Sequence, residues 1–356
     1  MAQSLLSSAR KKEVAVALER GLAWLLKHQL ADGAWHSVTY GGLRDGAAVT
    51  SLNLYTLAKL PQAAQPNITT VVENAGQFLQ EGFQKRRTIA SPDGSLDYPT
   101  YAAAMVVAAA RRFPTLAKLV PRARLIEYLL SAQVSEPRGF TKDSPDYGGW
   151  DLLGVDDSRG ITTGTNVSVT LYAVEALADE DSEKANAARV LAKQWLLKAQ
   201  NATGDGSFPF TADAASLNNK ALWRDDERRQ PRGYGSPTAD GIQALLHCGM
   251  VRDDQAVESA VKWLIDHPEV EIVPGFQDLP VELGWRDGLR FYYAQSLARV
   301  LRLLPVIVAE ERADKLAKWL LAAQSAAVAW KNESARMRED DPLIATSFAL
   351  AALATL

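Results

Sequence analysis

The chain has little cysteine, no long apolar run and no excess of charge of either sign. One cysteine in 356 residues, Cys248, excludes an intrachain disulfide. Lys and Arg number 39 and Asp and Glu 42, which leaves a net charge of −3 and argues against nucleic acid as a partner. No segment reaches the roughly 18 consecutive apolar residues of a membrane span, and residues 1–20 lack the apolar core of a signal peptide. We therefore expect a cytoplasmic monomer or homodimer, with a peripheral membrane contact left open.

What the chain does contain is a recurring segment in which a helix ends near a glutamine and an aromatic residue follows a glycine turn. In the first copy, apolar residues at helical spacing lead to Gln29, Asp32-Gly33 stops the helix, and Trp35 follows. We expect Gln29 to tie the helix end to the turn and Trp35 to pack beneath it. The later copies end at Leu96, Phe140, Phe208, Phe276 and Trp330. A repeat that fills the chain in this way decides the fold.

A second kind of helix follows each copy and is richer in small and apolar residues, which indicates burial on more sides. These helices are expected to start near Asp45, Tyr98, Thr165, Pro237, Leu289 and Pro342. The helices that carry the repeat are charged instead, as in the segment from Glu183 to Lys193. Six such alternations of charged outer and apolar inner helices are what closure into a double ring requires, and we expect a single all-α domain over residues 1–356.

Loop lengths indicate which end of the inner ring carries function. The longest connections, 139–161, 203–231 and 270–288, all lead into the starts of inner helices, whereas short ones follow their ends. Because the inner helices run parallel, the long loops should crowd one mouth, where binding residues concentrate. Aromatic residues in these loops, such as Trp150 and Phe210, could roof an apolar cavity or simply pack the loops.

The repeat, aromatic-Leu-x-x-x-Gln followed by Gly-x-aromatic, resembles the QW-type repeat of squalene and hopene cyclases and of protein prenyltransferase β subunits. The resemblance covers nearly all of the chain and implies an (α/α)6 toroid related to terpenoid cyclases. Residues 234–241, 274–275, 289–293 and 345–350 resemble a bacterial branch of these prenyltransferase and squalene-oxidase repeat proteins. For that branch the resemblance implies the fold and no particular reaction.

The signature acids of these families are not present in their usual form. Class II terpenoid cyclases donate a proton from the central Asp of an Asp-x-Asp-Asp motif. Arg338-Glu339-Asp340-Asp341 aligns with this motif, but it begins with Arg and is followed by Pro342. The Asp-Asp-x-x-Asp motif that binds magnesium in class I synthases is absent. Prenyltransferases bind zinc through Asp, Cys and His, but Cys248 and His247 lie at the far end of an inner helix, so we expect no zinc.

Asp240 is the leading candidate acid, because it lies about one turn inside an otherwise apolar helix. Burial would raise its pKa, as a proton-donating carboxyl group requires. The alternative is a structural carboxylate paired with Arg290 or with a helix N–H, and the sequence does not decide between the two. Asp45, Asp340 and Asp341 lie at other inner-helix starts and are further candidate acids, although Asp341 is also a typical N-cap residue.

Candidate substrate-binding residues lie at the same helix starts. They are Tyr101, Asn166, Tyr234, Thr238, Trp285, Arg286, Arg290, Tyr292 and Tyr293. The aromatic rings could stabilise developing carbocations, and Arg286 and Arg290 could meet the charge of a diphosphate. Magnesium is possible only if the substrate is a diphosphate, and we expect no other cofactor.

We therefore expect a terpenoid-cyclase-like protein that binds or transforms an isoprenoid or polyprenyl ligand in a central apolar cavity. A non-catalytic binding or scaffold toroid that has lost the cyclase acids is one alternative. A carbohydrate-active (α/α)6 enzyme is a second, because paired carboxylates in an aromatic-lined cleft suit glycoside hydrolysis. The QW-type repeats argue against this second alternative.

Overall fold

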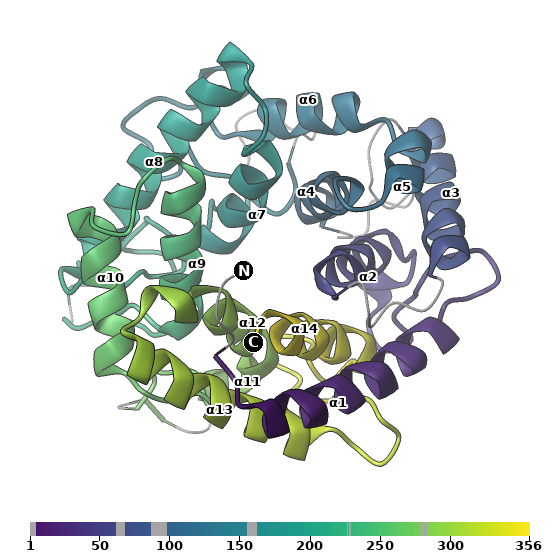
Figure 1. Cartoon of the computed structure of the whole chain (residues 1–356). Coiled ribbons are helices and arrows are strands. Elements are labelled where there is room, and N and C mark those ends of the chain that lie inside the picture. Colours follow the sequence, from purple (N-terminus) through teal and green to yellow (C-terminus); the bar gives the residue numbers. More distant parts are fainter. Residues whose placement is uncertain are drawn as a thin grey trace.

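The computed structural model describes residues 5–61, 68–86, 98–154, 162–225, 227, 229–277, 279–280 and 283–356. Within these residues helices follow one another along the chain, and the extended pairing is limited to an isolated bridge between Trp223 and Pro231. Figure 1 shows the helices as two concentric rings, which confirms the expected all-α (α/α)6 toroid. In the described part of the chain, no helix combines the length and the apolar character that crossing a membrane requires.

The inner ring closes on itself. Its helices in the described residues are α2 (Ala47–Lys59), α4 (Pro99–Ala110), α7 (Val167–Leu177), α9 (Gly235–His247), α12 (Arg290–Val300) and α14 (Pro342–Thr355). Each of them contacts the next, and α14 returns to contact α2 (Figure 1). Composition explains their position: every residue of α7 is buried, because its small and apolar side chains can pack on neighbours all around the helix.

The outer ring consists of amphipathic helices that pack against the inner ring. Among the described residues these are α1 (Ser8–Lys27), α3 (Thr69–Arg86), α6 (Arg122–Ala132), α8 (Glu183–Thr203), α10 (Gln255–Asp266) and α13 (Val306–Ala323). In α10 the buried residues Val257, Ala260, Val261 and Leu264 follow the spacing of a single helix face. Shorter helices complete the described structure: α5 (Pro114–Leu119), α11 (Trp285–Gly288), η1 (Gly41–Leu43), η3 (Glu136–Arg138) and η5 (Leu301–Leu303).

The long loops lead into α7, α9 and α11, as their positions in the sequence predict. Part of each loop lies outside the described residues. These parts are 155–161 in the first loop, 226 and 228 in the second, and 278 and 281–282 in the third. Because each inner helix follows an outer one, all inner helices run in the same direction, and these loops meet at one end of the ring.

The glutamine of the repeat joins neighbouring outer helices. Gln133, which follows α6, donates to the carbonyl oxygen of Gly148 in its own turn at 2.8 Å and to that of Ala188 in α8 at 2.9 Å. The same pair of bonds, to the turn and to the next outer helix, is made by Gln29, Gln200 and Gln324. The bond from Gln324 reaches Ala17 of α1 and closes the outer ring. The predicted tie between helix end and turn is confirmed and extends to the next repeat.

The aromatic residue of the repeat anchors the turn to both rings. In the third repeat Trp150 is fully buried, its indole N–H donates to Leu129 O of α6 at 2.7 Å, and its backbone N–H donates to Thr170 Oγ1 of α7 at 3.1 Å. The corresponding threonines on the other inner helices are Thr50, Thr238 and Thr346. The prediction of Phe140 for this place is wrong, because the turn that Gln133 contacts contains Gly148 and leads to Trp150.

Buried ion pairs join the inner helices at the end opposite the long loops. Glu175 of α7 accepts hydrogen bonds from Lys59 of α2 at 2.8 Å, from Arg299 of α12 at 2.9 Å and from Tyr55 at 2.8 Å. Burial alone would raise the pKa of Glu175, but the charges of Arg299 and Lys59 lower it well below its usual range. The ion pairs of Glu175 with Lys59 and Arg299 therefore occupy this end of the inner ring.

Candidate functional site

A cavity of about 340 Å³ lies within the inner ring, near the helix starts. All of the inner helices contribute to its wall, and Leu152, Lys220 and Trp285 from the three long loops line it as well. The wall is mostly apolar and aromatic, and includes Val49, Leu52, Met105, Tyr172, Phe210, Ile344 and Phe348. Such a cavity is typical of a small-molecule site, and the predicted gathering of the long loops at one mouth is confirmed.

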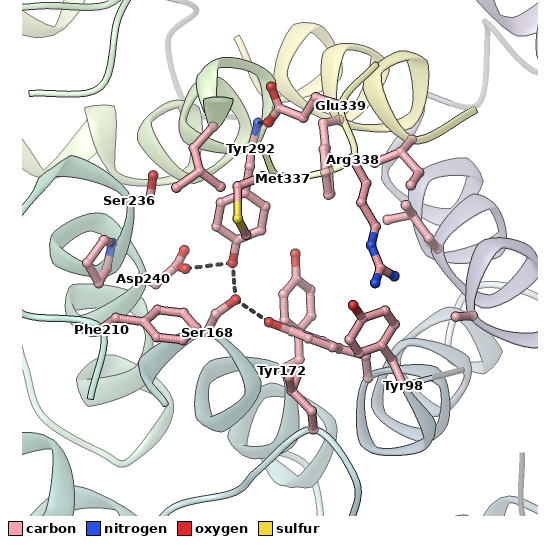
Figure 2. A pocket seen from close by; sticks show the side chains of 18 of the residues that line it. Tyr98, Ser168, Tyr172, Phe210, Ser236, Asp240, Tyr292, Met337, Arg338 and Glu339 are labelled. Carbon is pink, nitrogen blue, oxygen red and sulfur yellow. Dashed lines mark hydrogen bonds between the residues drawn. The ribbon is translucent and has the colours of Figure 1, made fainter. Parts of the chain in front are cut away.

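A chain of hydroxyl groups runs along this wall and ends at a carboxyl group (Figure 2). Tyr101 of α4 donates to Ser168 Oγ of α7 at 2.7 Å, and Ser168 shares a hydrogen bond with the Tyr292 hydroxyl of α12. Tyr292 in turn donates to Asp240 Oδ2 of α9 at 2.6 Å, and Ser296 donates to Oδ1 at 2.7 Å. Helices α4, α7, α9 and α12 are thereby linked through side chains at the cavity.

Asp240 is almost completely withdrawn from bulk solvent, with 1% of its surface exposed, yet it lines the cavity. Burial raises its pKa to about 6, although hydrogen bonds from Tyr292 and Ser296 favour the ionised form. Arg290, the ion-pair partner considered from the sequence, donates to Glu271 O at 2.6 Å instead. Asp240 therefore keeps its proton to a higher pH than an exposed carboxyl group, as a proton donor at near-neutral pH must.

Glu339 is a second carboxyl group on the cavity wall. It accepts hydrogen bonds from the backbone N–H groups of Phe291 at 3.1 Å and Tyr292 at 2.7 Å, and from Asn332 Nδ2 at 2.8 Å. Burial raises its pKa to about 7 in spite of these donors. Glu339 thus satisfies the free N–H groups at the start of α12. Tyr292 is held at both ends, by Glu339 at its backbone and by Asp240 at its hydroxyl.

Two cationic side chains also line the cavity. Lys220 is 6% exposed and places Nζ 3.5 Å from the ring centroid of Phe210, and burial lowers its pKa to about 7. Arg338 extends into the cavity and contacts the rings of Tyr40 and Tyr98, whose centroids lie 5.3 and 5.1 Å from Cζ (Figure 2). Aromatic faces attract cations, so both groups are held on rings at the cavity wall.

Five of the residues predicted for the site from sequence lie together on this wall. They are Tyr101, Tyr234, Asp240, Trp285 and Tyr292. Tyr101 and Tyr292 belong to the hydroxyl chain that ends at Asp240, whereas Tyr234 and Trp285 contribute ring surface from the start of α9 and from α11. The structure therefore combines the leading candidate acid with aromatic rings in one cavity.

The other three candidate acids are not part of the cavity lining. Asp341 is the N-cap of α14 and accepts a hydrogen bond from the backbone N–H of Leu343 at 2.9 Å. Asp340 accepts one from the Tyr40 hydroxyl, and Asp45 lies in the turn before α2. Capping, the alternative role considered for Asp341 from sequence, is what the structure shows for that residue.

Three of the predicted binding residues take part in local structure. Asn166 is the N-cap of α7. Thr238 belongs to the repeat contact described above and accepts from the backbone N–H of Phe208 at 3.0 Å. Tyr293 is buried, and its hydroxyl donates to Glu269 O at 3.2 Å. None of these three side chains lines the cavity.

The two arginines predicted to meet a diphosphate also lie away from the cavity lining. Arg286 pairs with its neighbour Asp287 at 3.2 Å, and the Arg290 guanidinium lies 5.0 Å from the ring centroid of Trp319 on the outer helix α13. Among the residues that the structure describes, the cations that line the cavity are Lys220 and Arg338.

Ser168, Lys220, Arg338 and Glu339 were missed as site residues from sequence. Arg338 and Glu339 belong to the segment that aligns with the Asp-x-Asp-Asp motif. Both line the cavity, whereas the two aspartates that follow them do not. Ser168 lies in the first turn of α7, a position that could have been read from the expected helix start. Lys220 lies in a loop, and nothing in its sequence neighbourhood indicates that it is buried.

No group of three or more His, Cys, Asp and Glu side chains that could hold a metal ion occurs among the described residues. Cys248 is the C-cap of α9, and burial raises the pKa of its thiol to about 12. His247 ends the same helix, and burial lowers its pKa. Both residues therefore lie at the opposite end of α9 from the cavity, as the sequence predicts.

Comparison with known proteins supports the fold. No protein-family profile matches the chain, and no curated protein matches its sequence. Among solved structures, the type II terpene cyclase MstE from Scytonema in complex with its substrate geranylgeranyl dihydroxybenzoate is similar, with a TM-score of 0.60 and 14% identity over 97% of each chain. The complex of MstE with its product merosterolic acid A is similar with a TM-score of 0.57 and 16% identity over 98% of each chain. A glycosidase in complex with glucose is similar with a TM-score of 0.54 and 13% identity, over 98% of this chain and 99% of the glycosidase chain. At such identities the similarity establishes a terpenoid-cyclase-like toroid fold.

Proposed function

We propose that the protein transforms an isoprenoid in the central cavity by proton-initiated chemistry, with Asp240 as the proton donor. The observation that carries this proposal is a carboxyl group with a pKa of about 6 on the wall of a mostly apolar and aromatic cavity. An alkene is a weak base, so its protonation needs an acid held close to it in the absence of competing water. Asp240 is such an acid, buried on the wall of a mostly apolar cavity.

In this reaction the Asp240 proton adds to one carbon of a double bond, and the alkene electron pair forms the new C–H bond. The cation left on the adjacent carbon is stabilised by aromatic ring faces such as Tyr172, Phe210 and Trp285. A second double bond of the substrate then attacks the cation and closes a ring. Water at the cavity mouth accepts the proton that is lost from carbon at the end of the sequence. The Tyr101, Ser168 and Tyr292 hydroxyls offer a route by which Asp240 regains a proton.

The fold similarity is consistent with this chemistry, because MstE is a type II terpene cyclase with a geranylgeranyl-bearing substrate. The proton step assigned to Asp240 uses only a carboxyl group of this chain. Magnesium is possible only with a diphosphate substrate, as stated from the sequence.

Of the two alternatives, the glycosidase has a specific observation behind it. Glycosidases share the fold, and Asp240 and Glu339 are both carboxyl groups with raised pKa values on the cavity wall. Glu339, however, is engaged by two backbone N–H groups and by Asn332, so it acts as a helix cap and only one carboxyl group remains available for acid catalysis. A protein that binds an isoprenoid without transforming it is the other alternative.

The test is incubation with squalene, farnesol, linear prenyl diphosphates and oligosaccharides in D₂O, followed by chromatography and mass spectrometry. Cyclisation started by Asp240 conserves the composition of the substrate except for one deuterium on carbon, so the product is a separate peak heavier by one mass unit. Asp240→Asn should abolish this product, whereas Asp266→Asn on the surface of α10 should not. Release of a monosaccharide without any labelled isoprenoid product would refute the proposal in favour of a glycosidase, and binding without turnover would refute catalysis.

A further inference from the structure

Arg338 brings a guanidinium group to an apolar cavity in which the described residues offer it no ion pair. Glu339, the acid next to it in sequence, points to the start of α12 instead. There it accepts hydrogen bonds from the backbone N–H groups of Phe291 and Tyr292. The Arg338 guanidinium lies against the rings of Tyr40 and Tyr98. Its Nη1 atom is buried and has no hydrogen-bond partner in the described part of the chain. A buried charged donor without an acceptor is costly, and a ligand in the cavity can supply that acceptor.

The backbone also holds Arg338 in an unusual conformation. Arg338 has φ of 64° and Tyr98 has φ of 45°, in the left-handed region that residues other than glycine rarely adopt. These two residues contact one another at the cavity, with the guanidinium 5.1 Å from the ring centroid (Figure 2). Strained residues persist where the surrounding structure requires them, often at ligand contacts. Strain at both members of the pair indicates that the position of the guanidinium matters.

Lys220 provides a second, independent cation. Its amine is buried on the Phe210 ring, and its polar contacts are with Asn218, at 3.2 Å to the side-chain oxygen and 3.4 Å to the carbonyl oxygen. Lys220 lies in the loop before α9 and Arg338 in the loop before α14, so both cations belong to the mouth end of the cavity. The apolar residues Leu52 and Met105 lie further along α2 and α4.

We infer that the cavity binds an apolar ligand with an anionic head group, a carboxylate or a phosphate, contacted by Arg338 and assisted by Lys220. The head lies at the mouth and the tail extends toward Leu52 and Met105. The isoprenoid nature of the tail rests on the proposed function. The negative charge of the head group rests on the two cations alone. Arginine suits this role because its planar fork can donate two hydrogen bonds to a carboxylate or phosphate.

The test uses farnesoic acid, farnesol and farnesylamine, which share one tail and differ in head charge. Their affinities are measured by isothermal titration calorimetry with the full chain. Farnesoate should bind about tenfold to a hundredfold more tightly than farnesol, as expected for hydrogen bonds to a charged group, and farnesylamine should bind most weakly. Farnesyl phosphate, as a further arm, distinguishes a phosphate from a carboxylate.

Variants assign the effect to the cation. Arg338→Gln should remove most of the preference for farnesoate and leave farnesol affinity unchanged, and Arg338→Lys should restore part of it. Arg336→Gln is the matched control, because Arg336 lies two residues away, is exposed and contacts the Trp285 ring at 5.5 Å. Equal affinities for farnesoate and farnesol in the wild-type protein would overturn the inference, as would a preference for farnesoate that survives in Arg338→Gln.

A second ligand pair separates this inference from the proposed function. Dodecanoate and dodecanol carry the same head groups as farnesoate and farnesol on a saturated tail that cannot be protonated at a double bond. If dodecanoate binds better than dodecanol and no farnesyl compound binds, the anionic head stands and the isoprenoid assignment falls. If farnesol is cyclised and head charge has no effect on affinity, the proposed function stands and the anionic head falls. If none of the ligands binds, both are refuted.

Discussion

Replacing Asp240 by Asn separates a proton donor from a structural carboxylate, because the two roles predict opposite effects on stability at neutral pH. The amide has nearly the shape of the carboxyl group, and its oxygen can still accept from Ser296. Its Nδ2 group can donate to the Tyr292 hydroxyl, which then donates onward to Ser168. The substitution therefore removes the charge and the proton and keeps the packing.

The magnitude follows from the raised pKa. In the unfolded chain Asp240 ionises near 3.8, and in the folded protein near 6. Between these values the folded state holds a proton that the unfolded state has lost, so the free energy of unfolding falls as the pH rises through this window. The total loss is about 3 kcal/mol above pH 6. Asp240→Asn has no such loss, so the variant should be more stable than wild type at pH 7.5 by up to about 3 kcal/mol, and no more stable at pH 4.

The assay is urea denaturation at several pH values, with the free energy of unfolding of each variant compared at the same pH. Asp266→Asn, a surface substitution on α10, is the control for general effects of removing a negative charge. A variant that is less stable than wild type by the same amount at pH 4 and pH 7.5 would refute the raised pKa, and would identify Asp240 as an ionised structural carboxylate. A stable Asp240→Asn variant that retains full turnover would remove Asp240 from the mechanism.

Three further predictions concern the ring and the second cation. Gln133→Ala leaves the carbonyl groups of Gly148 and Ala188 without their buried donor, and should lower the free energy of unfolding in urea by about 2–3 kcal/mol; an unchanged midpoint would contradict the role of the repeat glutamine. Glu175→Gln leaves Lys59 and Arg299 without their counter-charge, and should cost about 3–5 kcal/mol by the same measurement; a neutral effect would show that the ion cluster is not structural. Farnesoate should bind more weakly at pH 8.5 than at pH 6.5, because Lys220, whose pKa burial lowers to about 7, loses its proton in between. Lys220→Met should reduce this pH dependence, and titration calorimetry that shows the same slope in both proteins would contradict the assignment.

The fold was predictable from the sequence because it depends on a pattern that recurs. Gln29 and Trp35 look like an ordinary helix end when taken alone, but their repetition shows that each turn must serve a larger architecture. The bond from each glutamine to the next outer helix could not be read from the pattern, because it joins segments that are far apart in sequence. The prediction of Phe140 in place of Trp150 fails for a related reason. It follows the nearest glycine after Gln133, whereas in the structure the chain passes through a longer loop before it forms the turn.

The site was predictable only where helix periodicity determines direction. Asp240 lies within an apolar helix, and its burial and raised pKa follow from that context. Thr238 lies two residues earlier on the same helix, but it does not line the cavity and instead accepts a hydrogen bond from the repeat turn. The sequence did not show that the side chains of Thr238 and Asp240 point in different directions. Lys220 and Arg338 lie in loops, where no period relates position to direction, and their approach to the cavity depends on the closure of the whole ring.

The two inferences about the cavity depend on each other through charge, and this leads to the last prediction. An acid must keep its proton until the substrate is in place. A bound anionic head adds a negative charge to the cavity that Asp240 lines. This charge disfavours the ionised form of Asp240 and so raises its pKa above its value in the ligand-free protein. Infrared difference spectra of wild type against Asp240→Asn report the protonated carboxyl group directly. Titrated in this way, the pKa of Asp240 should be higher in the farnesoate complex than in the farnesol complex, because only farnesoate brings a negative charge into the cavity. Equal pKa values in the two complexes would show that the head group and the acid act independently.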